Sequence, residues 1–540
     1  MSNPLIAEFK TEFEATPFSK IKIADFIPAI KKTITVGLDE INSIINQKEV
    51  PSFKNTIEAI EKCGSLVGRN ASILFNLNSA ETNDELQGVT KAIAPLLSKF
   101  QNDIRLNEDL FKRIQFVYKN ENRKTLNTEQ ITLLEKEYKG FVRNGALLDS
   151  KAKIKLRNID MQLAELSLKF GENVLADTRN YQLHIKNKKK LEGLPISSIE
   201  MAESIAKNEN KKGWIFTLDY PSYVPFITYA DDRKLRKEIN LAFSNRGFRE
   251  NENNNTNIIL QIIELRQKRA SLLGYSSHAN FVLEERMAES EENVQNFLDD
   301  LTKKSKPFAK KEWASMQAFA KKYLNIEKIE KWDFAFVSEK LKEVEFDLNE
   351  EELKPYFQLD NVLSGLFEIA NRLYGMRFIE NTKLDRYHKE VKVFEVYKNN
   401  DFYALLYTDF FPRTGKRSGA WMTSYRSQKR NQRPHISIVC NFPRPTSNLP
   451  SLLTFQDVRT LFHEFGHALH GISANTNYGA LSGTNVYWDF VELPSQIMEN
   501  WCYETEALNL FAKHFKNQGL IPQDLIKRIK KAAYFQQGLQ

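Results

Sequence analysis

Two histidines and a glutamate in the segment FHEFGH have the spacing of a zinc-dependent hydrolytic site. His463 and His467 lie four residues apart, so on a helix their imidazoles project from the same side, one turn apart. Nitrogens placed in this way can reach one zinc ion at about 2.0–2.1 Å. Glu464 lies between them and is rotated away from direct ligation, where its carboxylate can take a proton from water at the metal. The segment therefore predicts one Zn²⁺ ion, with Glu464 as the catalytic base.

A catalytic zinc ion also requires a third protein ligand and one open position. We expect Glu492, 25 residues beyond His467, to be that ligand, because its segment carries a polar face opposite an apolar one. His470 is the alternative, but three histidines on one short helix would hold a tetrahedral ion with poor geometry, so we expect it beside the ligands or lining the cleft. Asp489 and Glu499 are predicted to accept a hydrogen bond from a ligand imidazole and orient it, with a plain surface position as the alternative for each.

Two helices are expected to position these groups. Thr454 followed by Asp457 resembles a capping box, which predicts the start of the first helix. Apolar residues share one face of this helix: Val458, Leu461, Phe462, Phe465 and Leu469. The histidines fall on the opposite face, as expected for a helix that lines a cleft. Within residues 482–501, a second helix is expected to carry Asp489, Glu492, Gln496 and Glu499 on one side. Pro494 would lie in its first turn, where the missing N–H costs little.

The rest of the sequence predicts a mainly helical fold with one small β-sheet next to the histidine-bearing helix. Gly (21) and Pro (17) are scarce for 540 residues, and the first ~380 residues read as amphipathic helices, one of them with Ser150 as its N-cap. VKVFEVY and FYALLYTDF flank a polar turn and predict a β-hairpin over residues 391–409, followed by a strand at 435–442. We expect the hairpin to offer an edge to which an extended peptide adds as a strand.

Composition and charge argue against several other classes of protein. The net charge of +8 is small and dispersed, and the basic run at residues 186–190 has no interleaved aromatics or arginines, so no nucleic-acid partner is expected. No apolar run approaches the ~20 residues that cross a bilayer and no signal peptide is visible, so no membrane partner is expected. The three separated cysteines, Cys63, Cys440 and Cys502, favour a reducing compartment. We expect a cytoplasmic monomer.

Longer motifs resemble one family of zinc peptidases. FHEFGHALH, followed by SGTN and DFVELPSQIMENW, is similar to segments of the thimet oligopeptidase and oligopeptidase A family. The resemblance covers nearly the whole chain and is nearest to the bacterial dipeptidyl carboxypeptidases of that family. It includes these further motifs: FKNTIEAIEKCG, SAETNDELQ, KPYFQLDNVLSGLFEIANRLYGMRF, GAWMTSY and VCNFPRP.

The resemblance implies a mainly α, two-lobed metallopeptidase with a deep substrate channel and the zinc site on its wall. Residues 1–215 would form part of the channel wall, and residues 216–540 the catalytic region. The family's zinc ligands and catalytic carboxylate map onto the residues named above: His463, His467, Glu492 and Glu464. The segment 478–484 would be a flexible loop near the substrate, and its candidate contacts are Gly479, Ser482, Gly483 and Thr484.

The implied activity is hydrolysis of short unstructured peptides with release of C-terminal dipeptides, that is, a peptidyl-dipeptidase. The alternative within the family is an endo-acting oligopeptidase. Family members continue beyond the point that corresponds to residue 540, so the resemblance also implies a catalytic region that lacks its C-terminal part. A chain of that kind leaves a third hypothesis, an inactive fragment that binds zinc or peptide.

Overall fold

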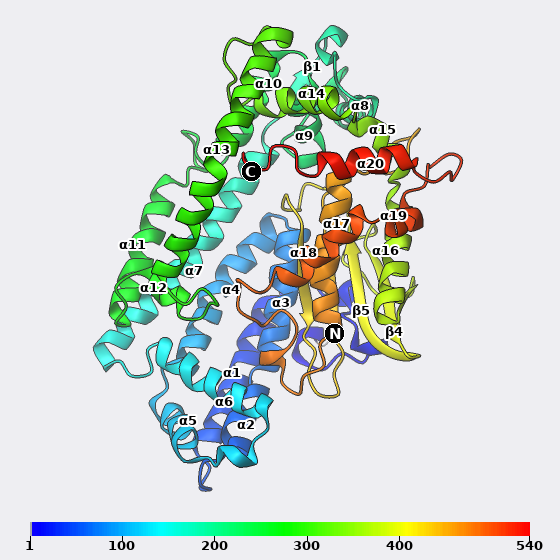
Figure 1. The fold of residues 1–540 in the computed structure, drawn as a ribbon. Helices are drawn as coiled ribbons and strands as arrows, with labels where there is room; N and C mark the ends of the chain where they lie inside the picture. The colour runs from blue at the N-terminus through cyan, green and yellow to red at the C-terminus, as the bar shows by residue number, and fades with distance from the viewer. Residues whose placement is uncertain (1–2, 540) are drawn as a thin grey trace.

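The computed structural model describes residues 3–539, and its N-terminal part is a set of packed helices (Figure 1). These helices are α1 (Phe26–Ile45), α2 (Glu58–Lys62), α3 (Ser65–Ala80), α4 (Asp84–Arg105), α5 (Glu108–Asn120), α6 (Thr128–Arg143) and α7 (Ser150–Arg179). The helix predicted from Ser150 onward is α7. Its N-cap is Asp149 rather than Ser150, because the Asp149 side chain accepts the backbone N–H of Ala152.

The middle of the chain forms a second group of elements. They are β1 (Leu183–Ile185), α8 (Ile196–Asn208), β2 (Trp214–Phe216), α9 (Tyr220–Tyr229), α10 (Arg233–Ser244), α11 (Thr256–Leu272), α12 (His278–Leu283), α13 (Glu291–Leu324) and α14 (Phe334–Phe346). The antiparallel pair β1–β2 shares one apolar core with α8, α9 and α10. The boundary predicted between residues 215 and 216 falls inside β2 and therefore cuts through this core. The division into a wall region and a catalytic region stays a prediction.

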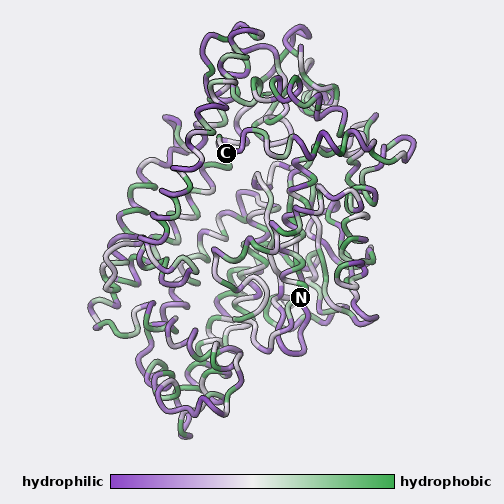
Figure 2. Tube along the Cα trace, viewed as in Figure 1, coloured by the Kyte–Doolittle hydropathy of each residue, from purple (hydrophilic) through white to green (hydrophobic). Residues whose placement is uncertain are grey.

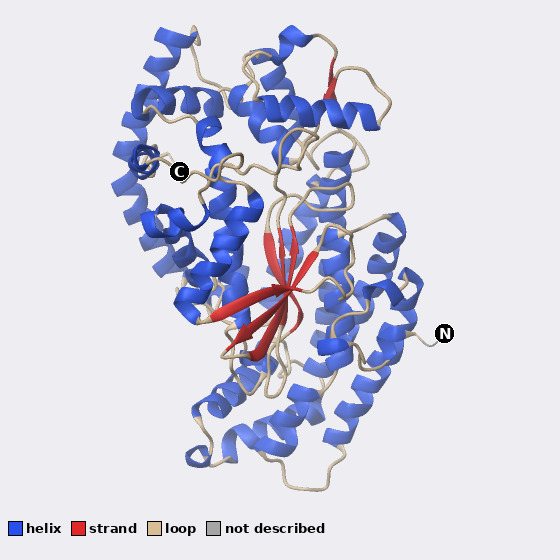
Figure 3. Cartoon of the chain, turned by 90° about the vertical axis from the view of Figure 1, so that its right-hand side faces the viewer, coloured by secondary structure: helices blue, strands red, loops and turns tan. Residues whose placement is uncertain are grey.

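A twisted five-stranded sheet lies at the centre of the molecule, with helices around it (Figure 3). Its strands are β3 (Met376–Glu380), β4 (Lys392–Lys398), β5 (Asp401–Asp409), β6 (Trp421–Arg426) and β7 (His435–Val439), in the order β3-β4-β5-β7-β6. The predicted hairpin is β4–β5, and the predicted later strand is β7. The expectation that this hairpin offers an edge to a peptide is wrong, because β4 pairs with β3 and β5 pairs with β7. Within residues 3–539, β6 is the edge strand beside β7.

Helices that precede and follow the strands in the chain pack with this sheet in one large apolar core. They are α15 (Glu350–Leu353), α16 (Leu359–Tyr374), α17 (Phe455–Ile472), α18 (Leu493–Glu499), α19 (Thr505–Phe511) and α20 (Gln523–Ala532). Hydrophobic and hydrophilic stretches alternate along most helices, as expected for helices with one buried face (Figure 2). In the described part of the chain, no helix has both the length and the apolar character needed to cross a membrane. The predicted fold class is confirmed: the chain is mainly helical, with a small sheet next to the helix that carries His463 and His467.

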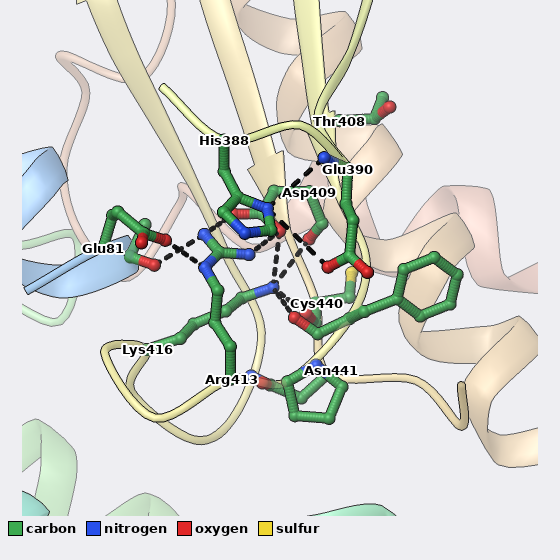
Figure 4. Close-up of polar contacts among 12 residues, drawn as sticks. Glu81, His388, Glu390, Thr408, Asp409, Arg413, Lys416, Cys440 and Asn441 are labelled. Atoms are coloured by element: carbon green, nitrogen blue, oxygen red, sulfur yellow. Dashed lines mark hydrogen bonds and ion pairs between the residues drawn. The ribbon is translucent and has the colours of Figure 1, made fainter. Parts of the chain in front are cut away.

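A buried ion network ties the carboxyl end of β5 to the end of α3 (Figure 4). The fully buried Asp409 accepts hydrogen bonds from both terminal nitrogens of Arg413, at 2.8 and 2.6 Å, and from Nζ of Lys416 at 2.8 Å. The Tyr387 hydroxyl donates to the same carboxylate at 2.6 Å. Arg413 also pairs with Glu81, which caps α3. Every charge in this network has a partner, which offsets the cost of removing it from water.

Candidate metal centre

Helix α17 begins where the sequence predicts and carries the histidines on its open face. Thr454 Oγ1 accepts the backbone N–H of Asp457 at 3.0 Å, and Asp457 Oδ2 accepts that of Thr454 at 2.9 Å, so the capping box is formed with Asp in place of the usual Glu. Phe462 and Phe465 are fully buried on the opposite face. The helix therefore packs against the sheet, and Phe465 contacts Phe367 of α16.

The two histidines and Glu492 converge on one point. The Nε2 atoms of His463 and His467 each lie 3.1 Å from Oε2 of Glu492. One nitrogen or oxygen atom from each residue falls within 4.8 Å of the other two. Two imidazoles and a carboxylate at that spacing fit a zinc ion with a remaining coordination position. The structure thus brings together the three predicted ligands from two segments separated by 24 intervening residues, 468–491.

The start of α18 positions Glu492. This residue is the N-cap of α18, and Pro494 lies in the first turn as predicted. The fully buried Ser495 donates its hydroxyl to Oε2 of Glu492 at 2.9 Å. The helix begins only at Leu493, because the preceding residues form turns and bends, so Asp489 lies outside the helix on which it was expected.

Glu499 orients one of the histidines. Its Oε1 lies 2.8 Å from Nδ1 of His463, and its Oε2 accepts from Arg459 at 2.6 Å. The hydrogen bond to Glu499 raises the pKa of His463, and the same bond lowers the pKa of Glu499. With Nδ1 engaged in this way, Nε2 is the nitrogen that faces Glu492. This is the arrangement that a carboxylate makes with a metal-binding imidazole.

The other candidate partners of the ligands point elsewhere. Oδ2 of Asp489 accepts the backbone N–H of Ala288 at 2.9 Å, in the turn between α12 and α13. Asp489 lies outside α18, so it does not share a helix face with Glu492. His470 is half-buried on the last turn of α17, and its ring lies 6.5 Å from that of Phe490. Neither residue belongs to the group of converging ligand atoms.

The predicted base, Glu464, lies one residue after His463 and is only 6% exposed. Its Oε2 atom has no hydrogen-bond partner among residues 3–539. Burial raises the pKa of Glu464 to about 7, while the nearby His463 lowers it and Glu492 raises it again. A buried carboxylate with one free oxygen and a pKa near neutrality is suited to accepting and returning a proton.

The predicted substrate loop lies against the N-terminal helices. The Tyr478 hydroxyl donates to Glu58 at 2.6 Å, and Lys136 Nζ donates to the carbonyl of Ala480 at 2.6 Å. The Ser482 hydroxyl donates to Gln428 at 3.1 Å. Hydrogen bonds thus connect this segment to α2, to α6 and to Gln428. The role of Gly479, Ser482, Gly483 and Thr484 in a flexible loop near the substrate stays a prediction.

The sequence interpretation missed two residues that shape the site, Gly466 and Ser495. A Cβ atom at Gly466 would lie 2.5 Å from Cα of Ser495, so this glycine permits the close approach of α17 and α18. A glycine in the interior of a helical pattern was a usable signal, since glycine is unfavourable there without a packing reason. Ser495 directly follows Pro494 in the sequence. No rule of residue spacing predicts that its hydroxyl contacts Glu492.

Comparison with known proteins agrees with this geometry. The family model described as "Peptidase family M3" matches residues 226–540. The chain is 34% identical to oligopeptidase A of Salmonella typhimurium over 550 residues, covering 100% of this chain and 80% of the relative. It is also 34% identical to dipeptidyl carboxypeptidase of Escherichia coli over 545 residues, with the same coverage. A thimet-like oligopeptidase of Dictyostelium discoideum is 32% identical over 93% of this chain and 76% of its own length. The converging ligands, the family model and these full-length similarities together show that the chain is a metallopeptidase that belongs to peptidase family M3.

Proposed function

We propose that the protein hydrolyses short, unstructured peptides with one zinc ion held by His463, His467 and Glu492. The observation that carries this proposal is the convergence of these three side chains beside the buried carboxylate of Glu464. The donor set of two imidazoles and one carboxylate is that of known zinc peptidases. Ser495 and Glu499 support it, because each fixes one of the ligands by a hydrogen bond.

The zinc ion, Glu464 and Glu499 have separate roles in the proposed hydrolysis. A zinc ion bound there supplies Lewis acidity, which lowers the pKa of water and polarises a carbonyl group. Glu464 accepts the proton of the attacking water and passes it to the amide nitrogen of the leaving peptide. Its raised pKa favours both transfers near neutral pH. Glu499 keeps the Nε2 of His463 directed at the metal position.

The edge strand beside α17 is β6, whereas β4 and β5 of the hairpin are internal strands. α3 also contacts β6, and within residues 3–539 no further strand pairs with its outer edge. An extended peptide added to β6 as a further strand would have its backbone hydrogen bonds satisfied while one peptide bond lies over Glu464. This mode of binding selects extended peptides, because a folded protein has few free strands to offer.

Release of C-terminal dipeptides is the mode of cleavage that we favour. It is supported by the similarity to dipeptidyl carboxypeptidase along the full length of this chain. Endo-cleavage is the second candidate, because oligopeptidase A is equally similar, at 34% identity. Digestion of a ten-residue peptide separates the two. Successive dipeptides from the C-terminus are expected, and internal fragments as first products would favour the endopeptidase.

Glu464→Gln tests the role of the base. We expect the variant to keep its zinc, measured by metal analysis after dialysis, and to lose at least about 10²-fold in peptide turnover, since general base catalysis contributes that much. Glu506→Gln is the matched control, because Glu506 is exposed on α19 and lies outside the site. An undiminished rate in Glu464→Gln would show that this residue is not the base, and a zinc-free wild type would refute the metal site.

A further inference from the structure

A cavity of about 820 Å³ lies where the end of α7, the helix α8 and the turn before α9 meet the loops that follow β5 and β7. Its lining includes none of the residues of the metal centre, so it is a separate site. Each of the five segments contributes to the wall, for example through Arg179, Ser204, Asp219, Thr414 and Thr446. A cavity of this volume is large enough for a small organic molecule.

Most charged side chains on the wall of this cavity already have partners. One part of the wall is the ion network of Figure 4, in which Arg413 and Lys416 share Asp409. The partners of the other engaged groups are Glu390 for Arg444, Glu203 for Lys207, Lys211 for Glu209, and both Thr446 and Asn448 for Glu200. This leaves Arg179 and Asp219 as the two charged groups of the wall that lack a counter-charge and full hydrogen bonding within residues 3–539.

Arg179, the last residue of α7, is a cation without an acceptor in the described part of the chain. Its Nε and Nη2 atoms are buried and have no hydrogen-bond partner. Burial lowers the pKa of this guanidinium, and Asp84 offsets only part of that effect. A charge withdrawn from water without a partner is unfavourable. Nε and Nη2 carry parallel N–H donors that bind a carboxylate bidentately, so a carboxylate in the cavity gives them a partner once the side chain turns towards it.

Asp219, the N-cap of α9, is the matching anion. Its Oδ2 accepts the Thr217 hydroxyl at 2.9 Å, whereas its Oδ1 accepts no hydrogen bond from any described residue. Burial raises the pKa of Asp219, although the Thr217 bond and the charge of Arg246 counteract part of this rise. Arg179 does not neutralise Asp219, since no ion pair joins the two within residues 3–539. An ammonium group in the cavity would supply the missing counter-charge.

We propose that this cavity binds a short zwitterionic peptide, with its C-terminal carboxylate on Arg179 and its N-terminal ammonium on Asp219. The inference goes beyond the proposed function, because no residue of the metal centre takes part in it. The cavity is larger than a single amino acid, so a dipeptide or tripeptide fills it better. A simple anion such as acetate would satisfy Arg179 but would leave Asp219 without a cation and add a like charge beside it.

Isothermal titration calorimetry with the zinc-loaded protein tests the ligand. The probes are Ala-Ala, its N-acetylated form, its C-terminal amide, free alanine and acetate. Removal of either charged end should weaken binding at least about 10-fold, the usual effect of losing a hydrogen bond between charged groups. Absence of binding at millimolar Ala-Ala overturns the proposal, as does equal binding of acetate. An affinity for alanine equal to that for Ala-Ala overturns the assignment to a peptide.

Two substitutions assign the two ends of the peptide. Arg179→Gln should bind Ala-Ala at least about 10-fold more weakly than the wild type and should no longer distinguish it from its amide. Asp219→Asn can still accept the Thr217 hydroxyl, and it should no longer distinguish Ala-Ala from the N-acetylated form. Arg266→Gln is the matched control, because Arg266 is exposed on α11 and does not line the cavity. It should bind every probe as the wild type does.

His467→Ala separates this cavity from the metal centre. Ala-Ala has the size of a product of the proposed hydrolysis, and a peptide at the metal centre would depend on His467. We expect this variant to bind Ala-Ala with unchanged affinity. If His467→Ala abolishes binding while Arg179→Gln does not, the peptide lies at the metal centre and the proposed cavity site is refuted. A protein that binds Ala-Ala as expected but cleaves no peptide would refute the hydrolysis and leave the cavity site standing.

Discussion

A Cβ atom at Gly466 would lie 2.5 Å from Cα of Ser495 and 2.7 Å from the carbonyl oxygen of Pro494. Gly466 is the residue between Phe465 and His467, one of the proposed zinc ligands, and it faces the first turn of α18. The missing side chain allows the two helices to come together closely enough for Glu492 to meet both histidines. A glycine in a helix interior costs roughly 0.5–1 kcal/mol relative to alanine, so its presence here has a packing reason.

Gly466→Ala should therefore destabilise the protein although alanine is the better helix former. The added methyl group must push α18 away from α17, and overpacking of this kind costs about 1–3 kcal/mol. Because Glu492 moves with α18, we also expect weaker zinc binding. Thermal unfolding and zinc content after dialysis measure the two effects.

Gly68→Ala is the matched control for that experiment. Gly68 lies within α3, and a Cβ atom there would meet nothing within 4 Å. We expect this variant to be as stable as the wild type or more stable, with unchanged zinc content. If Gly466→Ala behaves like Gly68→Ala, the close approach of the two helices does not depend on the glycine.

Glu499→Ala should weaken zinc binding without removing a ligand. Its carboxylate orients His463 through Nδ1 and is itself held by Arg459. Loss of such a partner typically reduces metal affinity by about 10- to 100-fold. Competition with a chelator of known affinity measures the change, and Glu506→Ala, an exposed residue of α19, serves as the control. Equal zinc affinities in the two variants would show that Glu499 has no part in orienting the histidine.

Periodicity in the sequence predicted the elements that carry the chemistry. The alternation of apolar and polar residues placed His463 and His467 on one face of a helix beginning near Thr454, and that helix is α17. The same reasoning places Asp489 on the next helix, which in the structure begins only at Leu493. The backbone before Leu493 forms turns and bends, and atoms of Asn485 and Asp489 bond to other parts of the chain. Tertiary contacts of this kind cannot be read from periodicity.

The order of the strands in the sheet was the other feature that the sequence did not predict. The β4–β5 hairpin is visible as two apolar runs around a turn. Whether its strands lie at the edge of the sheet depends on β3 and β7, which come from before and after it in the chain. β7 pairs parallel to β5, and no local signal specifies that pairing. The sequence therefore does not reveal that both strands of the hairpin are internal to the sheet.

Asp409→Asn should destabilise the protein strongly. The carboxylate neutralises Arg413 and Lys416 in a site that excludes water, and the amide would leave both cations without a counter-charge from this position. Breaking a buried ion pair from one side costs about 3–5 kcal/mol. Urea unfolding measures the loss. Asp360→Asn is the control, since the Asp360 side chain is 69% exposed in its pair with Lys392, and it should change stability by less than about 1 kcal/mol.

His435 should make stability depend on pH below neutrality. Burial lowers the pKa of this histidine to about 3, and the nearby Arg426 lowers it too. The unfolded chain takes up a proton on this imidazole near pH 6.5, whereas the folded chain does not. The contribution of His435 to the free energy of unfolding is therefore fully present above pH 6.5. It is lost as the pH falls towards 3, by about 1.4 kcal/mol per pH unit. His435→Gln cannot take up this proton. We therefore expect the stability difference between wild type and variant, from urea unfolding, to shrink by about 2 kcal/mol between pH 6.5 and pH 5. A difference that stays constant over this range would show that the imidazole is protonated equally in both states.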